Sequence, residues 1–95
     1  GGLVIDKDAY AVTRKGIQIK LSATEFRLLL YLVERKGRVF NREQLLNAVW
    51  SDEAFVEPRT VDVHIRRLRA QIEENPSSPR YIKTMRGAGY FFDGK

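Results

Sequence analysis

The sequence contains no cysteine and only one histidine, His64. Without cysteine, a disulfide framework, a thiolate zinc site and a cysteine nucleophile are excluded, and the composition suits a reducing cytosol. A single histidine with no acidic cluster at ligand spacing predicts no metal site and no cofactor. The serines fall in predicted caps and turns, so neither a catalytic triad nor the base and nucleophile of a small hydrolase can be assembled. We expect a protein that is not an enzyme.

Long apolar runs are also missing. The longest, residues 28–33, is far shorter than the roughly 18 residues that a membrane helix needs, which predicts a cytoplasmic protein with no membrane contact. With 95 residues, 43% of them hydrophobic and 31% charged, the chain has the composition of one globular domain. We interpret Gly1-Gly2 as a cloning scar or the cut end of a longer protein and place the domain at residues 3–95.

Acidic residues are outnumbered, and the excess of positive charge is local. The net charge is +5, and residues 59–69 contain four arginines and one aspartate, a net of +3. Residues 80–86 contain three basic residues and no acid. Such clusters indicate an anionic partner, with nucleic acid the first candidate. The segment 51–57 is acidic instead, which suggests a second, different partner.

At the N-terminal end, apolar residues alternate with polar ones in three short segments, which predicts an antiparallel β-meander. These residues are Leu3, Ile5, Tyr10, Val12, Ile17, Ile19 and Leu21. A helix follows, because Ser22 and Glu25 have the spacing of a capping box. Leu21 and Phe26 have the spacing of the accompanying hydrophobic staple. The helix is expected to end at about Lys36, before Gly37.

Two further helices are predicted. Asn41 and Gln44 form a second capping-box pattern, which begins a short helix that runs to about Trp50. Trp50 itself is expected to be half-buried packing, with its indole nitrogen available to a phosphate. The third helix is expected over about residues 58–74, since proline suits the first helical position at Pro58.

A β-hairpin is predicted at the C-terminal end. Its strands are residues 81–85 and 90–92, joined by the turn 86–89, which has the sequence Arg-Gly-Ala-Gly. Meander, three helices and hairpin follow one another in the order of an α+β fold, the winged helix-turn-helix.

The third helix is amphipathic in an unusual way. At about 100° per residue, one narrow arc holds Val61, Ile65, Leu68 and Ile72, which predicts a buried seam. The opposite arc holds Arg59, Val63, Arg66, Arg67 and Ala70, flanked by Asp62 and Arg69 on one side and by Thr60 and His64 on the other. The small side chains between the arginines allow the helix backbone to approach the base edges in a major groove of DNA.

Three alternatives to DNA binding remain for this helix. A solvated amphipathic face is the simpler interpretation, but solvated helices usually intersperse acids at i,i+4 spacing, and here Glu73 and Glu74 follow the basic face. A winged-helix protein-interaction module would bind an acidic protein with the same side. RNA is a weaker candidate, because the helix suits a B-form major groove.

The hairpin tip carries the second cationic group. Gly87 and Gly89 permit a tight turn, and without a following helix they are a weak pattern for a phosphate-binding loop. The same glycines leave Arg86 on a thin tip that can enter a minor groove, where the potential is most negative.

Several motifs together resemble one family. The sequences at residues 59–69 (Arg-Thr-Val-Asp-Val-His-Ile-Arg-Arg-Leu-Arg) and 84–90 (Thr-Met-Arg-Gly-Ala-Gly-Tyr) are similar to the C-terminal effector domain of OmpR/PhoB-type response regulators, especially the phosphate-regulon branch. Further matches lie at residues 24–26, 42–46 and 49–50. Met85 and Ala88 depart from the common pattern without threatening the fold.

The resemblance implies a two-component transcriptional regulator that binds promoter DNA, with Arg66 and Arg67 nearest the bases. Asp62 and Val63 are expected to assist them, and Arg86 to reach the minor groove. The full set of expected DNA-binding residues is Trp50, Arg59, Thr60, Asp62, Val63, His64, Arg66, Arg67, Arg69, Thr84, Arg86, Gly87 and Tyr90. Within it, phosphate contacts are assigned to Arg59, Thr60, His64, Arg69, Thr84 and Tyr90.

The resemblance also implies partners. The acidic loop 51–57 would meet the sigma subunit of RNA polymerase through Asp52, Glu53 and Glu57, as expected of an activator. Family members usually dock head to tail on direct repeats. Regulation by a sensor histidine kinase would pass through a receiver domain, which this sequence does not contain.

Overall fold

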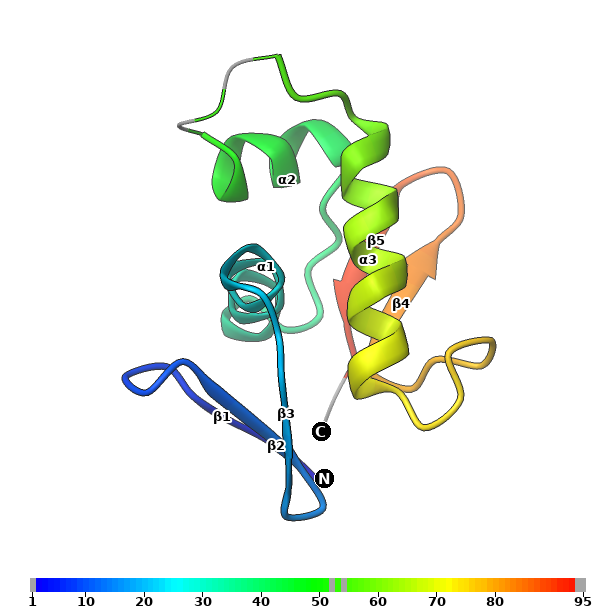
Figure 1. The fold of residues 1–95 in the computed structure, drawn as a ribbon. Coiled ribbons are helices and arrows are strands. Elements are labelled where there is room, and N and C mark those ends of the chain that lie inside the picture. The colour runs from blue at the N-terminus through cyan, green and yellow to red at the C-terminus, as the bar shows by residue number, and fades with distance from the viewer. Residues whose placement is uncertain (1, 52, 54, 94–95) are drawn as a thin grey trace.

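The computed structural model describes residues 2–51, 53 and 55–93. The elements are β1 (Leu3–Asp6), β2 (Ala11–Arg14), β3 (Ile17–Ile19), α1 (Ala23–Glu34), α2 (Arg42–Val49), α3 (Arg59–Ile72), β4 (Ile82–Met85) and β5 (Gly89–Phe92). The sheet of β1–β3 lies at the end of the molecule away from α2, and α3 runs across the hairpin of β4 and β5 (Figure 1). The predicted winged helix-turn-helix is confirmed.

The N-terminal sheet is antiparallel in the order β1-β2-β3, with Val12 at its buried centre. Val12 pairs with Ile5 on one side and Ile19 on the other. Two residues of the predicted alternation are exposed instead. Ile17 is 71% exposed on the outer strand, and Tyr10 lies in the turn after β1 with φ 53°. The alternation therefore predicted the strands but not which of their side chains are buried.

Both predicted capping boxes are confirmed. The Ser22 side chain accepts a hydrogen bond from the backbone of Glu25, whose carboxylate accepts from the Ser22 backbone. Asn41 and Gln44 make the same reciprocal pair at the start of α2. These bonds satisfy amides that a helix start leaves without partners, so the sequence fixes where both helices begin.

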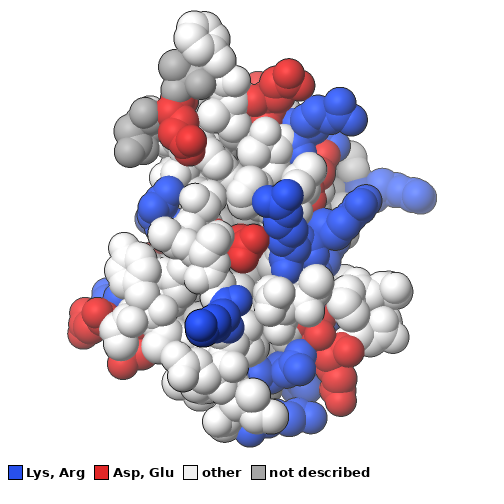
Figure 2. All heavy atoms as spheres, in the orientation of Figure 1, with Lys and Arg blue, Asp and Glu red and all other residues white. Residues whose placement is uncertain are grey.

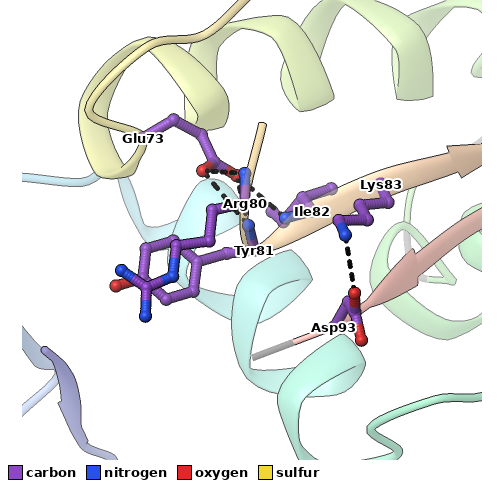
Figure 3. A network of polar contacts seen from close by, with 6 residues as sticks. All are labelled: Glu73, Arg80, Tyr81, Ile82, Lys83 and Asp93. Atoms are coloured by element: carbon purple, nitrogen blue, oxygen red, sulfur yellow. Dashed lines mark hydrogen bonds and ion pairs between the residues drawn. The ribbon is translucent and has the colours of Figure 1, made fainter. Parts of the chain in front are cut away.

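The third helix is shorter than predicted at its C-terminal end. It ends at Ile72, and Glu73 is extended with φ −87° and ψ 139°. The reason is visible in Figure 3: the Glu73 carboxylate accepts hydrogen bonds from the backbone amides of Arg80, Tyr81 and Ile82. Glu73 is only 3% exposed. In its extended conformation, the buried carboxylate binds the backbone amides at the start of β4, and the helix therefore ends one residue earlier, at Ile72.

The core lies where the three helices meet, covered by the hairpin and the N-terminal sheet. Its buried members are Val12, Phe26, Leu28, Leu29, Leu32, Phe40, Leu45, Val49, Trp50, Val61, Ile65, Leu68, Ile72, Tyr81, Ile82 and Phe92. All four residues of the predicted seam of α3 belong to it. At about 25 cal/mol per Å² of apolar surface removed from water, this burial holds α3 against α1 and α2.

The hairpin is joined to the body through backbone hydrogen bonds from β5. Phe40 and Tyr90 exchange two N–H···O bonds of 2.9 Å, and the Gly37 amide donates to the Phe92 carbonyl at 2.9 Å. Gly89, predicted to lie in the turn, is the first residue of β5 and pairs with Met85. It lies so close to Phe40 that only glycine fits, since a Cβ there would be 2.0 Å from the Phe40 carbonyl oxygen.

Membrane-spanning helices and metal-binding groups are both absent from the part of the chain that the structure describes. No described helix is long and apolar enough to cross a membrane. Within the same residues, no group of three histidine, aspartate or glutamate side chains is placed to hold a metal ion.

Candidate nucleic-acid interface

One side of α3 faces away from the core and consists of arginines and small side chains. Its exposed residues include Arg59, Val63, Arg66, Arg67 and Ala70. Figure 2 shows Lys and Arg side chains gathered along the side of the molecule where α3 lies, several of them projecting outward. The predicted outward orientation of Arg66 and Arg67 is therefore confirmed.

The exposed arginines carry uncompensated charge. Among the described residues, no carboxylate oxygen lies within 4.0 Å of a side-chain nitrogen of Arg59, Arg66, Arg67 or Arg86. Among the described residues, the one ion pair that involves α3 joins Asp62 to Arg42 and uses none of these four arginines. Four guanidinium groups with no carboxylate partner in the described part of the chain make the outer side of α3 and the wing tip attractive to an anion.

The flank of α3 that carries Thr60 and His64 is held by ring packing. The His64 ring meets Trp50 edge-on with centroids 5.1 Å apart, and Nδ1 lies 3.0 Å from the carbonyl oxygen of Thr60. Because a carbonyl only accepts, Nδ1 carries the hydrogen, and Nε2 is an acceptor in the neutral ring. Trp50 is 5% exposed, so it is core packing, more deeply buried than predicted.

The opposite flank holds Asp62 in a three-residue cluster. The Arg42 guanidinium donates from Nε to Oδ1 at 3.1 Å and from Nη2 to Oδ2 at 2.8 Å, and the Tyr90 hydroxyl donates to Oδ1 at 2.5 Å. Burial raises the pKa of Tyr90 to about 12, helped by this hydrogen bond and the charge of Asp62 and opposed by Arg42 and Arg69. Tyr90 is thus a hydroxyl donor at every ordinary pH.

Sequence analysis predicted Asp62 and Tyr90 as DNA contacts and missed Arg42 as their partner. Arg42 stands in a matching motif on α2, 20 residues before Asp62. No local spacing signals such a pair, because α2 and α3 are brought together only by core packing. The predicted contacts Asp62 and Tyr90 are engaged with each other inside the domain.

Arg69 connects α3 to the hairpin. Its Nε donates to the backbone carbonyl of Ile82 at 2.9 Å, and its Nη2 donates to the hydroxyl of Thr84 at 2.8 Å. The guanidinium carbon also lies 5.7 Å from the centre of the Tyr90 ring. Arg69 and Thr84, both predicted to bind phosphate, therefore have partners within the chain.

The wing tip presents Arg86 to solvent. Met85 accepts a hydrogen bond from the amide of Ala88 at 2.9 Å, closing a turn whose third residue, Gly87, has φ 79°. Turns with positive φ at that position favour glycine, so Gly87 has a conformational role as predicted. Arg86 and its neighbours in the turn are exposed.

A groove of about 560 Å³ separates the wing from the start of α2. Its lining residues are Asn41, Arg42, Glu43, Pro58, Thr84, Met85, Gly87, Ala88, Gly89 and Tyr90. The hollow leaves the hairpin tip standing apart from the start of α2.

The acidic loop has an unexpected apolar member. Glu53 and Glu57, predicted to contact the polymerase, are exposed, while Asp52 lies outside the described residues. Phe55 is fully exposed at 102% and has φ 63°. Sequence analysis gave Phe55 no role, although an aromatic residue among acids and outside any periodic pattern could have marked it.

Comparisons with known proteins agree on the domain. A family model described as the C-terminal region of transcriptional regulatory proteins matches residues 16–92. The response regulator DrrB of Thermotoga maritima, an OmpR/PhoB homologue, is 48% identical with a TM-score of 0.91. That match covers 99% of this chain and 42% of DrrB, so the chain spans about two-fifths of that relative.

Two similar domains have been solved on DNA. The DNA-binding domain of Klebsiella pneumoniae RstA, in complex with the RstA box, is 34% identical with a TM-score of 0.87, and the match covers 98% of this chain and 92% of that one. The DNA-binding domain of the response regulator AdeR, in complex with an intercistronic region, is 29% identical with a TM-score of 0.82. The match covers 100% of this chain and 96% of AdeR's.

Proposed function

The chain belongs to the family of transcriptional regulatory proteins of the OmpR/PhoB type, matching their C-terminal domain, and from this premise we propose that it binds double-stranded DNA at specific sequences. The observation that supports this most directly is the unneutralised arginine side of α3, which faces solvent opposite a fully buried seam. The relatives solved on DNA support the same function.

In the proposed complex α3 lies in the major groove. Arg66 and Arg67 contact base edges, where a guanidinium can donate two hydrogen bonds to O6 and N7 of guanine. Val63 is 44% exposed between them and suits contact with a thymine methyl group, and Ala70 lets the helix backbone approach.

Phosphates are bound at the flanks. Arg59 is exposed at the first turn of α3, beside Thr60. His64 can donate to a phosphate through Nε2 only as the imidazolium, because Nδ1 already donates to the Thr60 carbonyl. For Trp50 the burial leaves only an edge contact through the indole nitrogen.

Four predicted contacts have partners within the chain; two of them can still contact DNA, and two are reassigned. The hydroxyl hydrogen of Thr84 is still available to a phosphate, because Thr84 accepts from Arg69. Arg69 keeps the donors of Nη1, which its two hydrogen bonds leave unused. Tyr90 donates its one hydroxyl hydrogen to Asp62. These two residues are therefore reassigned from DNA contacts to a contact between α3 and β5 that supports the interface.

The wing is proposed to contact the adjacent minor groove. Arg86 stands at the exposed tip, and Gly87 keeps the tip narrow. Minor grooves of A·T-rich DNA are narrow and strongly negative, so an inserted arginine gains most there. The wing would thus add a preference for sequence flanking the major-groove site.

The regulatory context completes the proposal. The exposed Glu53 and Glu57 would contact the sigma subunit of RNA polymerase, as in an activator, and the sequence adds Asp52 of the same segment as a candidate. A receiver domain, outside this chain and phosphorylated by a sensor histidine kinase, would control a cytoplasmic regulator of the phosphate-regulon branch. Two copies would bind direct repeats head to tail.

Selection of bound duplexes from a random pool tests DNA binding. The purified chain is expected to enrich one motif, repeated at a spacing of about one helical turn, roughly 10–10.5 base pairs. Heterologous duplex should compete weakly and an acidic protein not at all. Enrichment of no motif, or equal competition by every polyanion, would instead support the alternative of a protein-interaction module.

A further inference from the structure

The position of strand β4 in the wing depends on α3. Strand β5 is joined to the α1–α2 connection by backbone hydrogen bonds at Phe40 and Gly37. Strand β4 pairs with β5 on one side, and its contacts with the body include side chains from α3: Arg69 and, just beyond the helix end, Glu73. The tip residue Arg86 directly follows β4.

Two clasps connect α3 to the hairpin. The first is Arg69, bound to the Ile82 carbonyl and the Thr84 hydroxyl. The second is Asp62, bound to the Tyr90 hydroxyl of β5. Asp62 and Arg69 are seven residues apart, which is about two helical turns, so both lie on one flank of α3 and face the wing.

Arg69 acts through geometry more than charge. Both of its acceptors, the Ile82 carbonyl and the Thr84 hydroxyl, are neutral, and among the described residues no carboxylate lies within 4.0 Å of its guanidinium nitrogens. A guanidinium presents its N–H groups in a fixed fork, so two bonds from one side chain define both the distance and the angle between helix and strand. A lysine would keep the charge and lose this definition.

In the second clasp, Arg42 of α2 holds the Asp62 carboxylate in place. Arg42 of α2 binds both oxygens of Asp62, leaving Oδ1 directed at Tyr90. Because burial raises the pKa of Tyr90 to about 12, the hydroxyl keeps its hydrogen and donates to Asp62 at neutral pH. The clasp thus ties α2, α3 and β5 at one point.

We propose that Asp62 and Arg69 are positioning residues that hold the wing at a fixed distance and angle from α3, so that the two bind DNA as one rigid unit. The proposal rests on the DNA-binding function proposed above. Its consequence is a spacing requirement: the minor-groove site of Arg86 must lie at one fixed separation from the major-groove site of Arg67. Rigidity also means that the wing is ordered before binding, which lowers the entropic cost of its contact.

The test measures how much DNA affinity depends on the wing, first in the wild-type protein and then in variants that lack the hydrogen bonds of one clasp. The duplex carries the selected motif with its A·T-rich flank, and a second duplex has one base pair inserted between motif and flank. The loosened protein combines R69K with T84V, which keep the net charge and nearly the same side-chain volumes. Y90F loosens the second clasp separately. Thermal unfolding confirms that each variant is folded at the temperature of the binding assay.

The wild-type chain is expected to lose roughly tenfold in affinity on the inserted duplex, and about as much when Arg86→Ala is introduced on the intact one. In the loosened protein both losses should shrink to about twofold, even if its absolute affinity is lower. A purely structural role would lower affinity for the two duplexes equally, so unchanged ratios in the loosened protein overturn the inference. If the wild type does not prefer the selected duplex over random DNA, the proposed function itself fails.

Discussion

A Cβ atom on Gly89 would lie 2.0 Å from the carbonyl oxygen of Phe40, closer than any real side chain approaches a backbone oxygen. The two residues are where the wing meets the α1–α2 connection, and Phe40 is also paired with Tyr90 by two hydrogen bonds. Glycine at this position is therefore a requirement of packing, in addition to its φ of 146°.

Gly89→Ala is expected to destabilise the domain by more than about 2 kcal/mol, because the backbone at Phe40 must move and both hydrogen bonds with Tyr90 weaken. Gly87→Ala is the matched control: it has positive φ but nothing within 4 Å of a new Cβ, so only backbone strain of about 1 kcal/mol is added. Urea unfolding measures both. Equal losses at the two positions would contradict the packing explanation.

Glu73→Gln is expected to cost about 2 kcal/mol of unfolding free energy. The buried carboxylate accepts from three backbone amides, and a glutamine has one acceptor oxygen and an NH2 group that cannot accept. Glu74→Gln is the control, since Glu74 is exposed and its contact with Lys15 is a 3.9 Å surface ion pair. Urea unfolding measures the free-energy loss of both variants. A general effect of removing one negative charge would give equal losses and would contradict the proposed role of the buried Glu73 carboxylate.

Arg67→Ala is expected to weaken binding to the selected duplex by about 1–3 kcal/mol and to relax the base preference at one position. Lys36→Ala removes the same charge from an exposed site outside α3 and the wing, so it should reduce affinity only slightly. Fluorescence anisotropy with the selected duplex and with random DNA measures both effects. An equal loss on the two duplexes would make Arg67 a phosphate contact.

Arg86→Ala is expected to weaken binding chiefly when the flank is A·T-rich, because a narrow minor groove concentrates negative potential. Replacing the flank by G·C pairs should remove most of the difference between variant and wild type. Titrations on the two duplexes at fixed salt check this. A loss that is independent of the flank would assign Arg86 to a phosphate.

Stability at alkaline pH should depend on Tyr90. Its pKa is raised from 10.0 to about 12 in the folded state, first by burial and then by Asp62, so the folded protein keeps a proton that the unfolded chain releases. The contribution is fully present below about pH 10 and is lost as the pH rises toward 12. Tyr90→Phe should therefore show a shallower fall in unfolding free energy than the wild type over this interval. Parallel curves would contradict the raised pKa.

Local signals in the sequence were enough for the elements and for the outward side of α3. The capping boxes at Ser22 and Asn41 depend on residues three apart, and the buried seam of α3 follows from a 3.6-residue period. Such signals are decided within one or two turns of chain. Helix starts, the amphipathic third helix and the exposed Arg66 and Arg67 are therefore properties of the sequence itself.

What only the tertiary structure decided are the contacts between elements. Asp62 meets Arg42 and Tyr90 across 20 and 28 residues, and Arg69 meets Thr84 across 15. No periodicity encodes these pairs, because packing of the apolar seam sets the distance between α3, α2 and the hairpin and thereby chooses which polar groups meet. The same packing buries Trp50 and draws Glu73 out of the helix.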